Sequence, residues 1–430
     1  MAQQVSLAFA YSYPGKYALT ALAGAVESSG ALLFFPRDTP ALIATVRARA
    51  EAGDRVLVAF SFYSPSFPES VAALAALRAA LPGAFTALAG GVHATAETEA
   101  VLEAGFDLVC VGEGEQALLE LLSRARAGVP LQGAAGFAFR SAGVTHRAPK
   151  PAPVALDAFA PFAVSHGHFG PIELTRGCIY ACRFCQTPFM SKARFRHRSV
   201  ESTRAAVAAM AAAGKWDVRF VSPSALSYGA TGEEVNLEAI DALLGAVRAE
   251  LGTRGRLFFG TFPSEVRPEH VTPEALRVLS KWVDNDNLVI GGQSGSNAVL
   301  QASHRGHDVA AIERAAEVAL EFGFLPNVDF ILGLPGETPD DVRSTVELMH
   351  RLADKGARVH SHTFMPLPGT PFRDAPAGDV PPDARAELER LASQKKAYGH
   401  WKAQVAVARE LASRRRTQMR SAMTRAESPR

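Results

Sequence analysis

The sequence has few cysteines, no strong excess of charge and no long apolar run. Only four cysteines occur in 430 residues, which excludes a fold built on disulfide bonds. The formal net charge is +2, which argues against a strongly basic nucleic-acid-binding protein. No window of about 18 apolar residues appears, and the first residues lack a basic stretch followed by an apolar one. We therefore expect a cytoplasmic protein that neither spans a membrane nor carries a secretory signal.

The composition and length indicate a folded protein with more than one core. Hydrophobic residues make up 48% of the chain and charged residues 20%, which excludes a disordered chain. The length is two to three times the typical domain size of about 150 residues, so we expect at least two domains.

The first domain is predicted over 1–130, where short apolar segments alternate with helical ones. Such an alternation is typical of a parallel sheet covered by helices on both faces. We expect an α/β, doubly wound, flavodoxin-like or Rossmann-like domain that binds its ligand at the carboxyl ends of the strands. The predicted strands lie within 5–12, 31–37, 55–64, 85–95 and 106–115.

A Gly-, Pro- and Ala-rich segment over 131–165 is predicted to be a linker, with a small hairpin within 137–147. A second α/β alternation over 166–375 contains six strand-and-helix units, which favours a partial (β/α)6 barrel over a full eightfold one. The segment 376–430 is predicted to be a helical extension with a basic tail. The predicted strands of the barrel lie at 171–177, 217–223, 256–262, 287–295, 326–333 and 358–364.

Three of the four cysteines form one short array directly after the first barrel strand. Cys178, Cys182 and Cys185 stand in TRGCIYACRFCQ with C-x3-C-x2-C spacing. Thiolates bind iron–sulfur clusters or zinc. A structural zinc site needs four ligands, so zinc would require a histidine such as His197 to complete it. Three thiolates on a cubane would instead leave one iron open.

This array resembles the signature of the radical S-adenosylmethionine (SAM) superfamily, whose members have an aromatic residue where Phe184 stands. The resemblance implies a [4Fe–4S] cluster whose open iron binds SAM, and cleavage of SAM to a 5′-deoxyadenosyl radical. Segments 291–307, 329–338 and 364–372 also resemble this superfamily, and Glu265 and Arg267 are further candidates for the same cavity. The residues implied to contact SAM are Phe184, Gln293, Ser294, Arg305, Asp329 and Gly333.

The first domain resembles the cobalamin-binding domain of the cobalamin-dependent radical SAM class. The resemblance rests on SFYS (61–64), GGVHAT (90–95) and CVGEGE (110–115). The first loop, YSYPGKY (11–17), lacks the D-x-H-x-x-G of many such domains, so no histidine from it ligates cobalt. A degenerate domain that binds no corrinoid is the alternative. The residues implied to line the cobalamin site are Ser61, Ser64, Gly90, Gly91, His93, Gly112 and Gly114.

These resemblances imply a radical SAM enzyme that also binds cobalamin and methylates an unactivated carbon or phosphorus centre of a small molecule. The alternatives are ring formation or rearrangement without methyl transfer, a methylthiotransferase acting on tRNA or protein, and a non-catalytic corrinoid or cluster sensor. We expect an external electron donor such as flavodoxin or ferredoxin, and neither a membrane nor a nucleic-acid partner. His360 and His362 alternate on one strand and so share a face, which makes them our candidates for acid–base catalysis.

Overall fold

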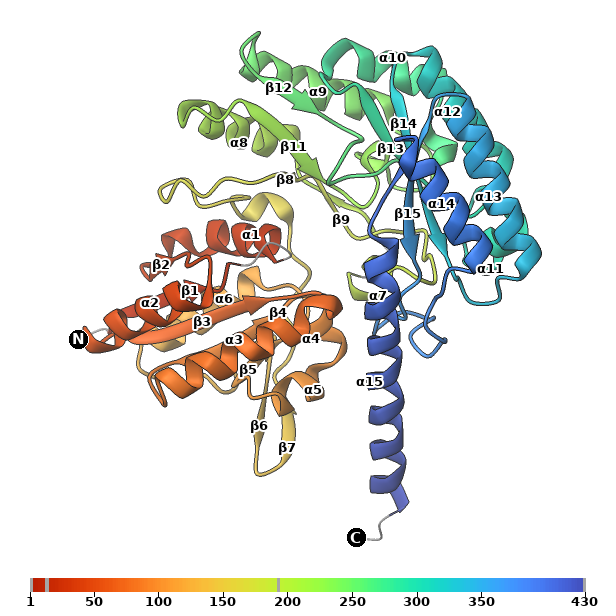
Figure 1. Ribbon diagram of the computed structural model, residues 1–430. Helices are drawn as coiled ribbons and strands as arrows, with labels where there is room; N and C mark the ends of the chain where they lie inside the picture. Colours follow the sequence, from red (N-terminus) through yellow and green to blue (C-terminus); the bar gives the residue numbers. More distant parts are fainter. Residues whose placement is uncertain (1–2, 12–14, 192–193, 428–430) are drawn as a thin grey trace. The chain divides into compact units, whose positions relative to one another are not determined.

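The structure, a computed structural model, describes residues 3–11, 15–191 and 194–427, with side chains as far as residue 419. The chain divides into two compact units (Figure 1). The first unit comprises Met1–Ile172 and Ala208–Gly214, and the second comprises Glu173–Val207 and Lys215–Arg430.

A seven-stranded sheet forms the centre of the first unit, in the order β2-β1-β3-β4-β5-β6-β7. Its first five strands run parallel, as the alternation of strands and helices predicts. The order reverses between β1 and β3, which makes that point the topological switch of the sheet. The parallel strands are β1 (Val5–Phe9), β2 (Leu32–Phe34), β3 (Arg55–Ser61), β4 (Thr86–Gly90) and β5 (Leu108–Cys110).

Helices cover both faces of this sheet because its strands are apolar on both sides. Leu7 of β1 lies in one core cluster with Leu19 and Leu118, from the helices of one face. Val58 of β3 lies in the other cluster with Val46 and Leu77. The first face carries α1 (Lys16–Val26) and α6 (Glu115–Arg126), and the second carries α2 (Thr39–Glu51), α3 (Phe67–Ala80) and α5 (Thr98–Glu103), with the short α4 (Val92–Ala96) after β4.

The segment predicted as a linker is part of the first unit. Strands β6 (Phe137–Ser141) and β7 (Val144–Arg147) form the expected hairpin, and β6 pairs antiparallel with β5. Glu113 also accepts a hydrogen bond from the backbone N–H of Val154 at 2.8 Å. This segment therefore extends the sheet and packs on its unit, and the Gly and Pro residues mark its turns.

Two groups of parallel strands form the sheet of the second unit, in the orders β12-β11-β8 and β13-β14-β15-β16. A parallel bridge between Val266 and Ile290 and the hydrogen bond from Val289 N to Gly260 O at 2.9 Å join them. The six predicted barrel strands are thus present. Their bounds are β8 (Ile172–Glu173) with β9 (Thr175–Arg176), β11 (Asp217–Val221), β12 (Arg256–Phe258), β13 (Asn287–Gln293), β14 (Leu325–Leu332) and β15 (Arg358–Thr363), to which the structure adds β10 (Arg196–His197) and β16 (Ala397–Tyr398).

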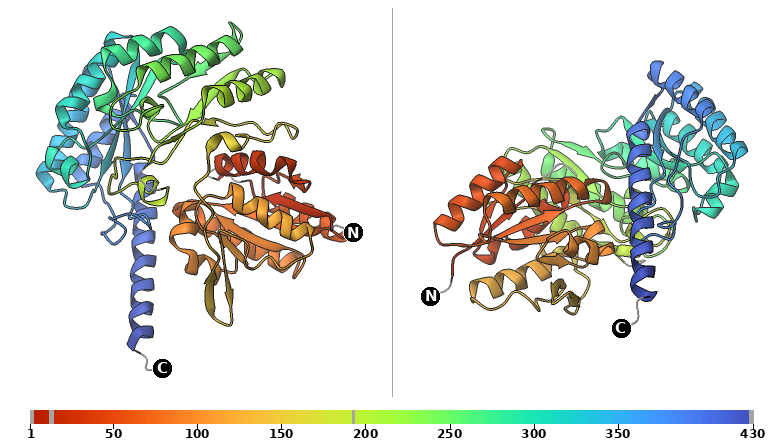
Figure 2. Two further views of the ribbon diagram at one scale, coloured as in Figure 1. Left: turned by 180° about the vertical axis from the view of Figure 1, so that it is seen from behind. Right: turned by 60° about the horizontal axis from the view of Figure 1, so that its bottom comes forward.

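The helices of the second unit form an outer layer around these strands (Figure 2, green to blue). Side-chain caps fix where five of them begin, since each cap residue accepts a hydrogen bond from a backbone N–H of the first turn: Asn236, Thr272, Ser296, Asp308 and Thr338. The helices are α7 (Thr187–Met190), α8 (Val200–Ala212), α9 (Leu237–Leu251), α10 (Pro273–Trp282), α11 (Asn297–Ala302), α12 (Val309–Glu321) and α13 (Pro339–Asp354), of which α8 belongs to this unit only as far as Val207.

The C-terminal segment is helical, as predicted, and packs on the barrel sheet. It contains α14 (Pro382–Ser393) and α15 (Trp401–Glu427), and β16 between them pairs with β15. Thr363 of β15 donates its hydroxyl to the carbonyl of Trp401 at 2.9 Å. This segment therefore belongs to the second unit. Among the described helices, none has both the length and the apolar character needed to span a membrane.

Candidate functional site

The three clustered cysteines lie in the loop between β9 and α7 of the second unit. Cys182 is buried, and Cys178 and Cys185 are partly buried. Burial raises the pKa of the Cys178 thiol to about 11 and also raises the pKa of Cys185. Without a bound metal these groups stay protonated at neutral pH. An iron–sulfur cluster or metal ion would supply the positive charge that stabilises them as thiolates.

The sulfur atoms of Cys178, Cys182 and Cys185 do not all lie within 4.8 Å of one another. In the described part of the chain, three ligand atoms within 4.8 Å of one another occur only at Asp329, His360 and His362. Thiolates that share one zinc lie about 3.8 Å apart, given Zn–S bonds of about 2.3 Å in a tetrahedron. The two ring nitrogens of His197 are also engaged, one with Thr175 Oγ1 at 3.0 Å and one with the Ala230 carbonyl at 2.9 Å. The zinc alternative with His197 is therefore disfavoured.

Three polar side chains converge on Gly291 of β13. A Cβ atom on Gly291 would lie 2.9 Å from Gln293 Nε2, 3.1 Å from Glu265 Oε2 and 3.2 Å from Arg305 Nη2, so a larger residue there would displace these side chains. Arg305 donates to the Gly291 carbonyl at 2.6 Å and lies with Nη1 3.6 Å from Cys182 Sγ. Sequence analysis named Gln293, Glu265 and Arg305 separately, and the structure brings them together beside a cluster cysteine.

The electrostatics of this group reflect its burial. Burial raises the pKa of Glu265 to about 7, although the Arg305 guanidinium nearby acts in the opposite direction. Gln293 ends β13 with φ +76°, at a register shift between Ile290 and Gln293 in the pairing with β14. This bulge directs the Gln293 side chain toward Gly291. Arg305 keeps its Nε buried without a hydrogen-bond partner among the described residues.

Three residues predicted to bind SAM have other contacts in the structure. The fully buried Ser294 hydroxyl lies 3.3 Å from Thr345 Oγ1 of α13 and accepts from the backbone N–H of Ser296 at 3.2 Å. Gly333 leaves room for the backbone of Asp379, which a Cβ there would approach to 2.6 Å. Phe184 packs against the apolar cluster that contains Leu334. These contacts support the fold, and the predicted contact of the three residues with SAM stays a prediction.

Asp329, His360 and His362 form a second polar group, on β14 and β15. His360 Nδ1 lies 2.9 Å from Asp329 Oδ1, and His362 Nε2 lies 3.9 Å from Asp329 Oδ2. The His360 ring stacks on Tyr398 of β16 at a centroid distance of 4.4 Å. The pairing register places Asp329 beside His360, so the shared face predicted for the two histidines is also the face of Asp329. Its carboxylate, predicted to contact SAM, is thus directed at two imidazoles.

The hydrogen bonds of Gln404, in α15, determine which ring nitrogen of His362 carries the proton. Gln404 Oε1 accepts from the backbone N–H of Thr363 at 2.8 Å, so its Nε2 is the atom 3.2 Å from His362 Nδ1. An amide nitrogen only donates, so Nδ1 of His362 accepts and the ring proton lies on Nε2, facing Asp329. His360 donates through Nδ1 to the same carboxylate. Both nitrogens that face Asp329 then carry protons, and only His360 lies within hydrogen-bond distance of the carboxylate.

Further charged and aromatic residues lie near the cysteine loop, and of these Glu269 and His307 were not predicted from the sequence. The Arg267 guanidinium stacks on Tyr180 at 3.6 Å from the ring centroid, and its Nε donates to Glu269 at 2.5 Å. His307 Nε2 donates to the Gly292 carbonyl at 3.1 Å. The spacing of His307 two residues after Arg305 was the available signal, but only the fold shows that both side chains reach the Gly291–Gly292 backbone.

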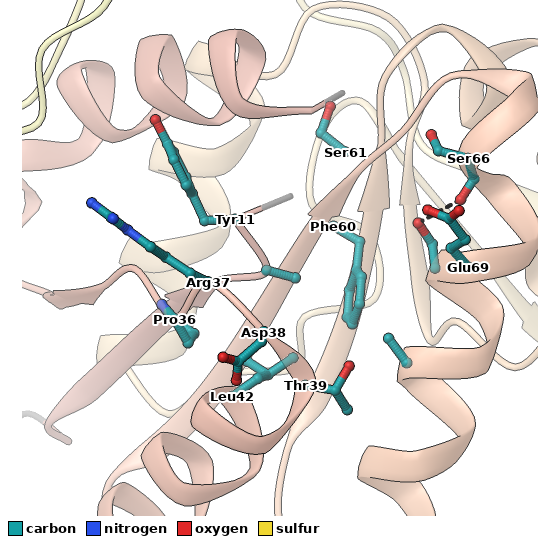
Figure 3. A pocket seen from close by; sticks show the side chains of 13 residues that line it. Tyr11, Pro36, Arg37, Asp38, Thr39, Leu42, Phe60, Ser61, Ser66 and Glu69 are labelled. Carbon is teal, nitrogen blue, oxygen red and sulfur yellow. Dashed lines mark hydrogen bonds between the residues drawn. The ribbon is translucent and has the colours of Figure 1, made fainter. Parts of the chain in front are cut away.

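The first unit has a hollow, open to solvent, at the carboxyl ends of β1, β2 and β3. It lies at the switch point of the sheet, where a doubly wound domain binds its ligand. Tyr11 and Arg37 lie on one side, Ser66 and Glu69 on the other, and Phe60 between them (Figure 3). Of the predicted cobalamin-site residues, only Ser61 is among those that line it, and the loop residues after β2 were missed.

The remaining predicted cobalamin-site residues lie at the carboxyl ends of β4 and β5 or are buried. Ser64 Oγ lies 2.9 Å from His93 Nδ1, and both side chains are buried, with the His93 ring against Phe67. Neither side chain is among those that line the hollow, and their part in cobalamin binding stays a prediction. Gly91, with φ +92°, allows close approach of the Phe62 carbonyl, which a Cβ would meet at 2.9 Å. Gly90 ends β4, while Gly112 and Gly114 lie between β5 and α6.

Comparison with family models supports this division of the chain. Residues 8–122 match the B12 binding domain, and residues 172–349 match the radical SAM superfamily. The chain carries a cobalamin-type domain and a radical SAM domain. The match to the radical SAM superfamily implies a [4Fe–4S] cluster and SAM, and the match to the B12 binding domain implies cobalamin. The three predicted cofactors are therefore confirmed at the level of the family.

Curated relatives resemble the radical SAM domain. A protein named tRNA-2-methylthio-N(6)-dimethylallyladenosine synthase from Halorhodospira halophila is 28% identical over 222 residues, which are 51% of this chain and 46% of that protein. Its counterpart from Methylococcus capsulatus is 31% identical over 225 residues, which are 51% and 47%. The chain thus spans about half the length of the curated relatives it matches.

Solved structures resemble this chain across both domains. The radical SAM methyltransferase TsrM from Kitasatospora setae, with cobalamin and a [4Fe–4S] cluster bound, aligns with a TM-score of 0.69 and 18% identity, over 88% of this chain and 75% of that one. The cobalamin-dependent radical SAM enzyme OxsB aligns with a TM-score of 0.66 and 16% identity, over 83% and 53%. At such identities the likeness concerns the fold, and the predicted α/β fold class is confirmed.

Proposed function

We propose that this radical SAM enzyme uses a [4Fe–4S] cluster, SAM and cobalamin to methylate an unactivated carbon or phosphorus centre of a small molecule. The observation that carries the proposal is the match of one chain to both the B12 binding domain and the radical SAM superfamily. The fold likeness to TsrM, a methyltransferase with both groups bound, supports it.

The protein's own residues have distinct tasks in this proposal. Cys178, Cys182 and Cys185 hold the cluster, and Gln293 and Glu265 lie beside it where SAM binds. The hollow at the carboxyl ends of β1 and β3 receives part of the corrinoid. The cofactors supply radical generation and methyl transfer, while the protein orients them and excludes water.

The Asp329–His360 pair is suited to move a proton during this reaction. The carboxylate orients the imidazole through Nδ1, at 2.9 Å, and Tyr398 holds the ring from its face. His360 Nε2 is then the nitrogen that exchanges a proton with the substrate, as a general acid or base. His362 stays neutral because burial lowers its pKa to about 4.

A methylthiotransferase is the second candidate, because the curated relatives that match the radical SAM domain carry that activity in their names. A methylthiotransferase is expected to hold a second cluster on three further cysteines in its N-terminal part. Outside the array at 178–185 this chain has only Cys110. Cys110 is buried in β5, and burial raises its pKa to about 12, so it is not poised to bind metal.

The test measures the products of SAM in protein purified without oxygen and reconstituted with iron, sulfide and hydroxocobalamin. A methyltransferase of this kind releases both S-adenosylhomocysteine and 5′-deoxyadenosine in the presence of a reductant and the methyl acceptor. Ring formation or rearrangement gives 5′-deoxyadenosine without S-adenosylhomocysteine. A sensor gives neither product.

Iron content separates the methylthiotransferase, which also releases both products. One [4Fe–4S] cluster corresponds to about four iron atoms per chain, and two clusters to about eight. The proposal expects the lower value together with retained corrinoid after desalting. The matched control is Cys110→Ala, which is expected to keep the iron content of the parent, whereas Cys182→Ala is expected to lose it.

A further inference from the structure

We propose that Arg305 sets the reduction potential of the cluster by donating to a cluster thiolate, rather than by holding the carboxylate of SAM. This inference rests on the proposed function, because it presupposes the cluster on Cys178, Cys182 and Cys185. It departs from the role that the superfamily resemblance implies for an arginine at this position.

The contacts of Arg305 are all internal to the cysteine site. Nη2 donates to the Gly291 carbonyl at 2.6 Å, and Nη1 lies 3.6 Å from Cys182 Sγ, within the range for a hydrogen bond to sulfur. The backbone N–H of Arg305 donates to the Leu300 carbonyl at 2.9 Å, so the residue is held at both ends. The side chain is buried. A guanidinium fixed in this way keeps its charge beside the sulfur.

In the part of the chain that the structure describes, the positive charge of Arg305 is not neutralised by an ion pair, whereas that of Arg267 is. Arg267, the other buried arginine beside the loop, forms an ion pair with Glu269 at 2.5 Å. Among the described residues Arg305 forms no ion pair, and its guanidinium donates instead to the Gly291 carbonyl and to Cys182 Sγ. Arg305 is therefore the cation that the Cys182 thiolate experiences most directly.

A buried cation and an N–H donor at a cluster thiolate both stabilise the reduced cluster, which carries one more negative charge than the oxidised one. Hydrogen bonds to sulfur and local charge are established controls of such potentials. Burial excludes the water that would screen the effect. Removing the guanidinium should therefore make the cluster harder to reduce.

The experiment titrates the potential of reconstituted parent and Arg305→Gln protein, followed by the EPR signal of the reduced cluster and without added SAM. We expect the ratio of reduced to oxidised cluster at a given potential to fall at least tenfold in the variant, which corresponds to a midpoint about 59 mV lower. Arg183→Gln is the matched control. Arg183 adjoins Cys182 in sequence but is exposed and donates to the Ala302 carbonyl, so its variant should keep the parent midpoint.

The outcomes separate this inference from the proposed function. If the parent binds no cluster, the proposed function fails. If Arg305→Gln binds a full complement of iron and keeps the parent midpoint while its affinity for SAM falls, Arg305 is a SAM ligand and the inference is wrong. If Arg305→Gln loses the cluster, the midpoint potential of Arg305→Lys is measured instead. Lysine keeps the positive charge but lacks the two N–H groups of the guanidinium, so its midpoint potential should fall by less than that expected for Arg305→Gln. An unchanged midpoint potential in Arg305→Lys would contradict the inference.

Discussion

Gln404 of α15 lies with its Nε2 3.2 Å from His362 Nδ1 of β15, while its Oε1 accepts from the backbone of Thr363. A residue of the C-terminal helix thus fixes which nitrogen of a barrel histidine carries the proton. His362 is held neutral by burial, with the neighbouring His360 contributing in the same direction, and its pKa falls to about 4. The C-terminal segment therefore takes part in the polar group around Asp329.

The lowered pKa of His362 should make stability depend on pH. In the unfolded chain His362 has a pKa near 6.5, so it takes up a proton below that pH that the folded protein does not bind. The free energy of unfolding should therefore fall as the pH drops from 7.5 to 5, by about 2 kcal/mol from this residue. His362→Asn should remove that part of the dependence.

Urea unfolding at the two pH values measures this effect. Trp216, Trp282 and Trp401 all lie in the second unit, so tryptophan fluorescence follows the unit that contains His362. His304→Asn is the control because His304 is exposed. If His362→Asn and the parent lose the same stability between pH 7.5 and pH 5, the neutral, buried state assigned to His362 is contradicted.

The hollow of the first unit should be required for corrinoid binding. Ala73 of α3 lines it, whereas its neighbour Ala72 is exposed on the same helix. Ala73→Phe fills part of the hollow and should weaken corrinoid retention at least tenfold, while Ala72→Phe should retain the parent level. Equal retention by the two variants in desalted, reconstituted protein would place the corrinoid elsewhere.

Ser294 should contribute to stability and not to SAM binding. Its buried hydroxyl bonds to Thr345 and to the backbone of Ser296, so Ser294→Ala should cost about 1 kcal/mol of unfolding free energy. The dissociation constant of SAM, measured by equilibrium dialysis on reconstituted protein, should change less than about twofold, given that free-energy scale. Gln293→Leu should weaken SAM binding instead, and the reverse pattern would restore Ser294 as a ligand.

The order of elements was readable from the sequence because each strand and helix carries its own signal. Apolar runs separated by helical stretches predicted the parallel strands in both units, and caps such as Asn236 and Asp308 mark helix starts. The hairpin at 137–147 was predicted, but not its pairing with β5, since no local pattern specifies which sheet edge a hairpin joins.

The residues of the candidate site could be predicted from the sequence only in part, because some of them lie far apart along the chain. The cysteine array is contiguous, so its spacing alone indicated a cluster. Glu269, Gln404 and Tyr398 reach the site from distant segments, and nothing local distinguishes them from surface residues. Ser294 and His93 fit family motifs, yet their side chains form internal hydrogen bonds, because a motif does not show which way a side chain points.

The most direct test of the central claim is made on anaerobically reconstituted parent and Cys182→Ala protein. Visible absorption and bound corrinoid are recorded after desalting, and 5′-deoxyadenosine is then measured after SAM and dithionite are added. The account predicts that the parent retains stoichiometric corrinoid and cleaves SAM, and that Cys182→Ala retains corrinoid but has neither cluster absorbance nor SAM cleavage. A parent without cluster absorbance, or a Cys182→Ala variant that cleaves SAM like the parent, would contradict it.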